Sequence, residues 1–148
     1  MTDIRFYQLL ATPLEAALPK LLEKATAQGM RAAIAAGTAE RAQALDAVLW
    51  TYAPESFLPH GRAPAPPADQ PIWLATDIEN PNGASLLVTL DGQQPERFED
   101  WKMVCDMFDG ADEAALEAAR ARWKTLKSAG HALSYWRQTT AGGWEKAA

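Results

Sequence analysis

Apolar residues follow strand-like and then helix-like spacing over the first part of this chain. Residues 4–10 are rich in strand formers, and Thr12 with Pro13 then places a capping residue and a first-turn proline ahead of a helix. Leucines and alanines recur at three- and four-residue spacing up to about Gln28, where a glycine follows. Pro19 interrupts this pattern, so we expect a kink there or a late start of the helix.

The same alternation continues through the first half of the chain. Residues 30–36 form a short apolar run that predicts a strand, and Gly37 with Thr38 supplies a turn and a helix cap. Apolar positions up to Leu49 then return at helical spacing. The pattern to this point predicts the order strand, helix, strand, helix.

The second half predicts three strands and a final helix. The runs 71–76 and 84–90 are typical of buried strands, whereas 98–108 fits a helix or an alternating strand, and we favour a strand that ends at Phe108. Turn residues and acids precede a helix over 112–129. Strands that alternate with helices predict a three-layer α/β/α domain with a mainly parallel central sheet.

Two segments fall outside this alternation. Residues 54–70 contain five prolines, which favours a surface connection in extended or turn conformation. Phe57 and Leu58 lie in this connection without any helical or strand period, so they either dock on the body or face a partner. The tail 131–148 holds one tyrosine and two tryptophans and is too aromatic to be disordered.

Length and composition indicate one ordinary globular domain. The chain has 148 residues, of which 48% are hydrophobic and 22% charged, and we expect residues 1–148 to form a single domain. The single cysteine, Cys105, cannot form an intrachain disulfide, and no signal peptide or membrane-spanning run is present. We therefore expect a cytoplasmic protein without contact to a membrane.

The charge is divided unevenly along the chain. The net charge is −5, but residues 1–113 carry 8 basic and 17 acidic side chains while residues 114–148 carry 6 basic and 2 acidic ones. The acidic total opposes direct clamping of nucleic acid phosphates, which needs a basic surface. The basic last segment favours an acidic partner, although a solvated helix face would have the same composition.

Motifs for catalysis, metals and cofactors are missing from the sequence. The junction at Thr12 has no glycine and therefore lacks the phosphate-binding loops of nucleotide-binding domains. His60, His131 and Cys105 do not have the spacing of a metal site, and no hydrolase motif is present. We predict no catalytic residue, no metal and no cofactor.

The two sides of the predicted last helix differ in chemistry. One side is small and apolar, and we expect it to lie on the sheet: Ala115, Ala118, Ala119, Leu126 and Ala129. The other side combines cations with large apolar residues: Leu116, Arg120, Trp123, Lys124 and Lys127. Arg122 falls on the apolar side, where we expect it to form an ion pair at the helix margin.

This mixed side fits a short acidic peptide. Arg120 and the two lysines, Lys124 and Lys127, would receive carboxylates while an apolar side chain enters beside Trp123. Single-stranded nucleic acid stacked on Trp123 is a competing use of the same side. A small molecule or nucleotide bound at the carboxyl ends of the strands is a third possibility, from another functional class.

Several distinctive stretches occur in order along the chain: Phe6-Tyr7-Gln8-Leu9, Leu45-Asp46-Ala47-Val48-Leu49-Trp50, Ser56-Phe57-Leu58-Pro59-His60, Gln70-Pro71-Ile72, Asn80-Pro81-Asn82-Gly83, Phe108-Asp109-Gly110, Ala119-Arg120-Ala121-Arg122-Trp123-Lys124, Gly130-His131 and Tyr135-Trp136. With these stretches, essentially the whole chain resembles the chi subunit of bacterial DNA polymerase III holoenzyme. The resemblance implies a non-catalytic accessory subunit of the clamp-loader assembly, with a nucleotide-binding-like layout that lacks a phosphate loop.

The resemblance also implies two partners. Family members bind the psi subunit, which tethers them to the clamp loader, and they bind the acidic, phenylalanine-ended tail of single-stranded DNA-binding protein. By position, Phe57 matches a residue used towards psi, while Trp50 and Arg120 match residues associated with the tail site. Nucleic acid would then be contacted only indirectly, through the protein that coats it.

Overall fold

A computed structural model of the chain describes residues 2–51, 60–61, 70–90 and 92–148. Within these ranges the chain alternates strands and helices, as the hydrophobic pattern predicts. The elements in chain order are β1 (Asp3–Leu9), α1 (Leu14–Ala27), β2 (Ala32–Ala35), α2 (Ala39–Thr51), β3 (His60–Gly61), β4 (Ile72–Ala75), β5 (Leu86–Thr89), a 3₁₀ turn (Phe98–Asp100), β6 (Met103–Asp109), α3 (Glu113–Ser128), β7 (Ala132–Gln138) and β8 (Trp144–Lys146).

The strands form one mainly parallel sheet in the order β3-β4-β2-β5-β6-β1-β7-β8. The pairs from β3 to β7 are parallel, and β8 alone among the described strands runs antiparallel, beside β7. All four residues of β2 and of β5 are buried. Such continuous apolar strands are typical of a parallel sheet that is covered on both faces.

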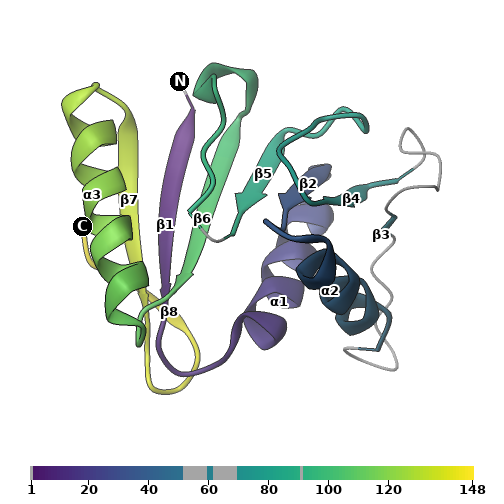
Figure 1. The fold of residues 1–148 in the computed structure, drawn as a ribbon, viewed down its shortest axis with the longest axis horizontal. Coiled ribbons are helices and arrows are strands. Elements are labelled where there is room, and N and C mark those ends of the chain that lie inside the picture. The colour runs from purple at the N-terminus through teal and green to yellow at the C-terminus, as the bar shows by residue number, and fades with distance from the viewer. Residues whose placement is uncertain (1, 52–59, 62–69, 91) are drawn as a thin grey trace.

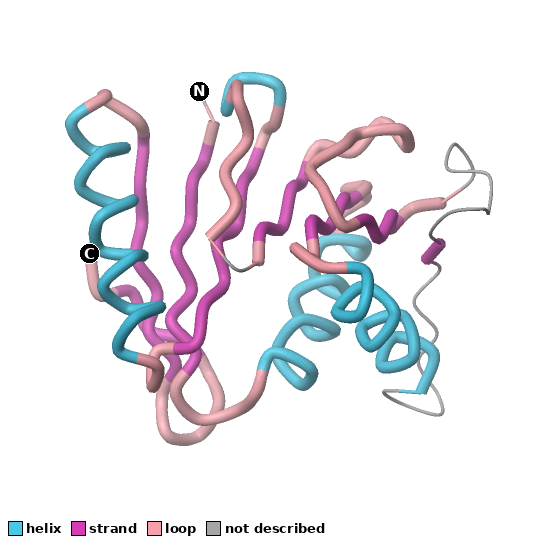
Figure 2. The backbone as a smooth tube through the Cα atoms, in the orientation of Figure 1, coloured by secondary structure: helices cyan, strands magenta, loops and turns pink. Residues whose placement is uncertain are grey.

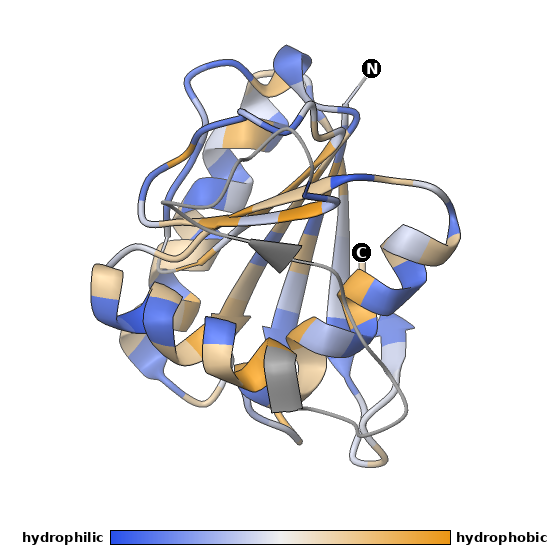
Figure 3. Ribbon diagram, turned by 90° about the vertical axis from the view of Figure 1, so that its right-hand side faces the viewer, coloured by the Kyte–Doolittle hydropathy of each residue, from blue (hydrophilic) through white to orange (hydrophobic). Residues whose placement is uncertain are grey.

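Helices lie on the two faces of this sheet and make three layers, as the sequence predicts (Figure 1). Helices α1 and α2 pack on one face around Leu18, Leu22 and Leu45. Helix α3 packs on the other face, close to β7, around Ala119 and Leu126 (Figure 2). Hydrophobic and hydrophilic residues alternate along the helices (Figure 3), and the buried apolar ones belong to the two cores on the faces of the sheet.

The start of α1 differs from the sequence prediction. The helix begins at Leu14, directly after Pro13, and continues through a buried Pro19, so the late start is wrong. Thr12 is not the cap, because Pro13 occupies that position and provides no side-chain hydrogen bond. The helix nevertheless holds, since the leucines around Pro19 are buried against the sheet.

Most other boundaries follow the predictions, but the strand predicted over 98–108 begins only at Met103, since residues 98–100 form a 3₁₀ turn. Thr38 caps α2, because its hydroxyl accepts a hydrogen bond from the Arg41 N–H at 3.1 Å, and β6 ends at Asp109, one residue beyond the predicted end. The connection 54–70 contains the two-residue strand β3, which the sequence does not predict, and its residues 54–59 and 62–69 lie outside the described residues. The aromatic tail is ordered as β7 and β8.

The junction between β1 and α1 is closed by the side chain of Gln138. Its Oε1 accepts hydrogen bonds from the backbone N–H groups of Leu10, Ala11 and Thr12 at 3.0, 2.8 and 3.0 Å. Its Nε2 donates to the hydroxyl of Thr12 at 2.7 Å, and the residue is only 4% exposed. Converging N–H groups at such a junction form an anion site in phosphate-binding folds. Here an amide oxygen of the same chain occupies that position.

Replacing Gln138 by alanine should destabilise the fold. The three N–H groups would lose their shared acceptor, and we expect the free energy of unfolding to fall by about 1–3 kcal/mol in chemical denaturation. Gln138→Glu retains an acceptor oxygen and should lose less, while Gln28→Ala on the exposed end of α1 serves as the control. A Gln138→Ala variant as stable as the wild type would contradict this role.

Candidate functional site

Helix α3 lies on the sheet through a different set of residues from the one predicted. Ala119 and Leu126 are buried as expected, but Ala118 and Ala129 are exposed. Leu116 and Trp123 are half-buried instead. Large side chains fill the space between the helix and the sheet, which alanines alone would leave empty. The packed face of α3 is therefore rotated towards Leu116 and Trp123.

Trp123 belongs to the packing of the domain. Its ring meets Phe6 of β1 edge to face at 5.5 Å between centroids, and Tyr135 of β7 at 5.7 Å. The prediction that Trp123 faces outward with the cations is therefore wrong in part: its half-buried ring leaves one portion at the surface. Edge-to-face contacts of this kind add about 0.5–1.5 kcal/mol beyond the area that they bury.

Arg120, Lys124 and Lys127 are exposed on the flank of α3 next to Trp123, and we refer to them as the basic flank of α3. The charge of Arg120 reaches β7: burial raises the pKa of the Tyr135 hydroxyl, and Arg120 and Arg137 oppose that rise. Sequence reasoning missed Arg137, which the two-residue period of β7 places on the same face as Tyr135. It lies opposite Glu145 of β8, which offsets part of its charge.

An apolar seam runs beside the basic flank. It is made of Leu116 and Trp123 from α3 and Leu133 and Tyr135 from β7, which are half-buried and pack on the core; we refer to these four as the α3–β7 seam. The Tyr135 hydroxyl donates a hydrogen bond to Oε1 of Gln8 at 2.6 Å, which fixes the ring in place. Cations and partly exposed apolar side chains therefore lie side by side along α3.

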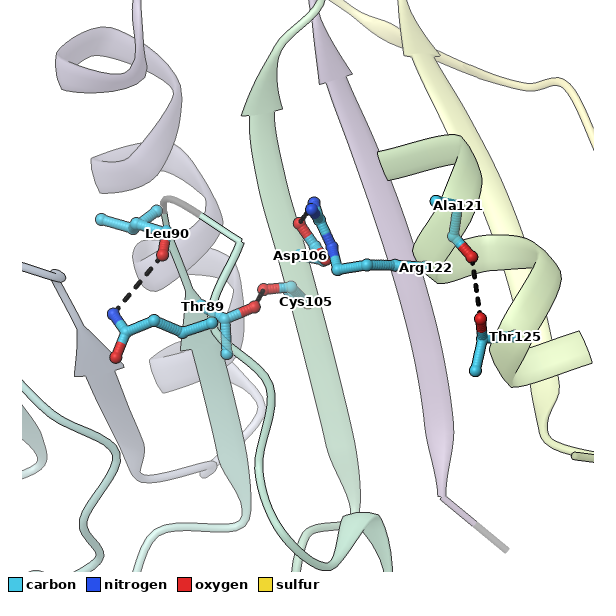
Figure 4. A network of polar contacts seen from close by, with 8 residues as sticks. Thr89, Leu90, Cys105, Asp106, Ala121, Arg122 and Thr125 are labelled. Carbon is cyan, nitrogen blue, oxygen red and sulfur yellow. Dashed lines mark hydrogen bonds and ion pairs between the residues drawn. The ribbon is translucent and has the colours of Figure 1, made fainter. Parts of the chain in front are cut away.

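Arg122 has a structural role, as predicted. It extends from α3 to Asp106 of β6, where its Nε and one terminal nitrogen donate to the two carboxylate oxygens at 2.8 and 3.0 Å (Figure 4). The side chains are 13% and 6% exposed. Burial raises the pKa of the Asp106 carboxyl, and the two hydrogen bonds from Arg122 oppose that rise. This pair attaches α3 to the sheet and leaves Arg122 outside the basic flank.

The two remaining predicted site residues come from other parts of the chain than α3. Trp50 lies in α2, which packs on the opposite face of the sheet from α3 (Figure 1), and its side chain lies outside what the structure describes. Phe57 lies outside the described residues. The candidate site is therefore described from α3 and β7.

A cavity of about 790 Å³ lies at the carboxyl ends of β1 and β6, between the starts of α1 and α3. This is the crevice where open α/β sheets bind small molecules. Its rim mixes Arg41 and Arg122 with Glu15, Asp109 and Asp112, and Gln138 occupies the adjacent N–H groups. No group of three His, Cys, Asp or Glu in the described ranges could hold a metal ion.

Two further observations concern a reactive thiol and a membrane-spanning helix. Burial raises the pKa of the Cys105 thiol to about 12, and the residue is fully buried in β6. A thiol in that state is a packing residue and a poor nucleophile. Among the described residues, no helix is both long and apolar enough to cross a bilayer.

Comparison with known proteins identifies similar sequences. The family described as "DNA polymerase III chi subunit, HolC" matches residues 1–134. A "Probable DNA polymerase III subunit chi" from Rickettsia prowazekii is 36% identical over 75 residues, which are 50% of this chain and 46% of that protein. The "DNA polymerase III subunit chi" of Pseudomonas aeruginosa is 28% identical over 137 residues, which cover 90% of this chain and 94% of that one.

Two arginines of α3 should differ sharply in their effect on stability. Arg122→Ala leaves the Asp106 carboxylate buried without its partner, and we expect a loss of about 3–5 kcal/mol in the free energy of unfolding. Arg120→Ala, two positions away on the exposed flank, should change it by no more than about 0.5 kcal/mol. Urea denaturation of both variants measures the difference, and equal losses would rule out this division of roles.

Proposed function

The chain belongs to the DNA polymerase III chi subunit family, and we propose that it is a non-catalytic accessory subunit that links the clamp loader to single-stranded DNA-binding protein. It would act in the cytoplasm, at the replication fork. In this proposal the protein contacts DNA only through the protein that coats it. The acidic net charge of −5 favours such an indirect contact.

The observation that carries the proposal is the basic flank of α3 beside the α3–β7 seam. The C-terminal tail of single-stranded DNA-binding protein is acidic and ends in phenylalanine, as the family resemblance implies. Its carboxylates would pair with Arg120, Lys124 and Lys127, which are exposed on one side of the helix. Its terminal ring would enter the seam at the exposed portion of Trp123.

Neither the ion pairs nor the burial of the terminal phenylalanine would give strong binding alone. An exposed ion pair contributes about 0–1 kcal/mol, so three such pairs give only weak binding. Burying a phenylalanine side chain contributes about 1.5–3 kcal/mol. Together they supply a moderate affinity that depends on salt, because the charges are screened within about 10 Å at 0.1 M ionic strength.

The second partner would be psi or an equivalent clamp-loader tether. Phe57 matches the family position used towards psi, and it lies in the proline-rich connection 54–70, away from α3 in the chain. Two separate contact regions would let the protein hold both partners at once. A bridging subunit needs that separation.

The structure favours the peptide over the two rival uses of the chain. Trp123 meets Phe6 and Tyr135 edge to face, so it offers little free ring surface for stacking a base. The crevice at the carboxyl ends of β1 and β6 has a volume suited to a small molecule, about 790 Å³. Its mixed charges, and the N–H groups that Gln138 already occupies, do not favour phosphate there.

Removing charge from the basic flank should weaken tail binding. We expect a labelled peptide of several aspartates ending in phenylalanine to bind Arg120→Ala about threefold to fivefold more weakly than the wild type, and the double variant Lys124→Ala/Lys127→Ala about fivefold to tenfold more weakly. Fluorescence anisotropy at low and high salt measures the change. Arg97→Ala, an exposed arginine outside α3, is the matched control. Equal affinity for wild type and Arg120→Ala would contradict the assignment.

Changing Phe57 should separate the two partners. We expect tagged Phe57→Ser protein to lose the clamp-loader subunits in a pull-down from cell extract while it still recovers single-stranded DNA-binding protein. Arg120→Ala should show the opposite pattern, since it lies in the other proposed contact region. Retention of both partners by Phe57→Ser would remove Phe57 from the tether contact.

A further inference from the structure

The face of the sheet that carries α1 is only partly covered by the described helices. Helices α1 and α2 pack mainly on β2, β4 and β6. On β1, β7 and β8, the side chains that point to this face include Arg5, Tyr7, Ser134, Trp136, Trp144 and Lys146, as strand alternation and register place them. Apart from Tyr7, these residues are half-buried or exposed. No helix from the described part of the chain therefore covers the strip of this face that β1, β7 and β8 form. We refer to this strip as the lane beside α1.

A cavity of about 650 Å³ lies in this lane, between α1 and the β7–β8 hairpin. We refer to it as the α1–β8 trench, and its main lining residues are Arg5, Tyr7, Lys20, Lys24, Met103 and Trp144. Its volume falls within the range of about 300–1,000 Å³ that ligand clefts have. The trench is on the opposite face of the sheet from the basic flank of α3, so it is a separate site.

The floor of the trench is apolar and aromatic. Tyr7 stacks on Trp136 at 6.5 Å with an interplanar angle of 22°, and it meets Trp144 edge to face at 4.9 Å. Met103 lies half-buried beside them and Met30 lines the same cavity. Methionine and aromatic floors of this kind adapt to the apolar stripe of a partner helix.

The rims of the trench are basic. Lys20 and Lys24 line the cavity and are exposed one turn apart on α1. Lys146 lies beyond the lining residues, exposed on β8 opposite Trp136. Arg5 is held on the floor by Asp3, with a nitrogen–oxygen distance of 2.9 Å, and lies 5.9 Å from the centre of the Trp136 ring. Asp3 and Glu23 reduce this charge without cancelling the three lysines.

The length of the lane matches a short helix. The seven residues of β1 extend over about 23 Å at roughly 3.3 Å per residue. A helix that rises 1.5 Å per residue needs about 15 residues for that distance. The neighbouring helix α1, with 14 residues, already covers the sheet over such a length.

We propose that the α1–β8 trench is a docking site for an acidic amphipathic helix of a partner protein, whose apolar stripe lies on Tyr7, Met103 and Trp144 while its carboxylates face Lys20, Lys24 and Lys146. Layered α/β domains cover both faces of their sheets with helices, and a partner helix would complete the layer here.

Single-stranded nucleic acid fits this surface less well. The Tyr7 ring is 6% exposed and already contacts the rings of Trp136 and Trp144, so it offers little surface on which a base could stack. An acidic amphipathic helix fits better, because its apolar side chains would enter the cavity while its carboxylates would lie near the lysines.

The test uses synthetic helical peptides and the full chain. One probe carries leucines along one stripe with glutamates beside them, and a second carries the same stripe with lysines. We expect the glutamate probe to bind at least about tenfold more tightly than the lysine probe, which corresponds to about 1.4 kcal/mol. In the charge-reversed variant Lys20→Glu/Lys24→Glu that preference should invert, while Arg97→Glu, at an exposed arginine outside both proposed sites, should leave it unchanged.

Other outcomes would overturn the proposal. Equal binding of both probes, no binding of either at about millimolar concentration, or tighter binding of an oligothymidylate strand would each exclude an acidic helix. A concentration-dependent dimer in sedimentation that Lys20→Glu/Lys24→Glu abolishes would assign the trench to a second copy of the chain. Trp144→Ala, checked for folding by circular dichroism, should weaken the glutamate probe through its apolar contact alone. Since Lys20 and Lys24 line the trench and lie on the opposite face from α3, a failure of this test leaves the proposed tail site untouched.

Discussion

The position of β1 is the constraint on which the rest of this structure depends. This strand pairs in parallel with β6 on one side and β7 on the other, so its alternate side chains must enter two different cores. Ile4 and Phe6 point under α3, whereas Tyr7 and Leu9 point to the side of α1. The α3–β7 seam and the α1–β8 trench both depend on this strand. The α3–β7 seam rests on Phe6 through Trp123, and the trench has Tyr7 as its floor.

Helix α3 packs on the sheet through one side and leaves its other side exposed to solvent. Ala119 and Leu126 face the sheet, Trp123 extends to Phe6, and Arg122 extends to Asp106. These contacts fix the rotation of the helix, and that rotation leaves Arg120 on the exposed flank. Buried ion pairs are costly to break and contribute little net stability, so the pair of Arg122 and Asp106 serves to define the position of α3 more than to stabilise it.

The junction after β1 shows how a nucleotide-binding layout can exist without its usual ligand. The parallel sheet and the crevice at its carboxyl ends resemble those of domains that bind phosphates. Gln138, which comes from the end of β7, supplies the oxygen that a phosphate would otherwise provide. The last part of the chain thereby closes the first turn.

The sequence by itself determined the order of the elements, the parallel sheet and the family. Hydrophobic periodicity and the order of motifs can be recognised along the chain without any knowledge of tertiary contacts. It also determined that Arg122 pairs while Arg120 stays exposed, since the two lie on different sides of one helix. Only the tertiary structure decided that Trp123 packs on Phe6, that Gln138 closes a junction 126 to 128 positions earlier in the chain, and that a trench remains beside α1. Helical angles show which residues share a side, but which side meets the sheet depends on the volumes of side chains that come from distant strands.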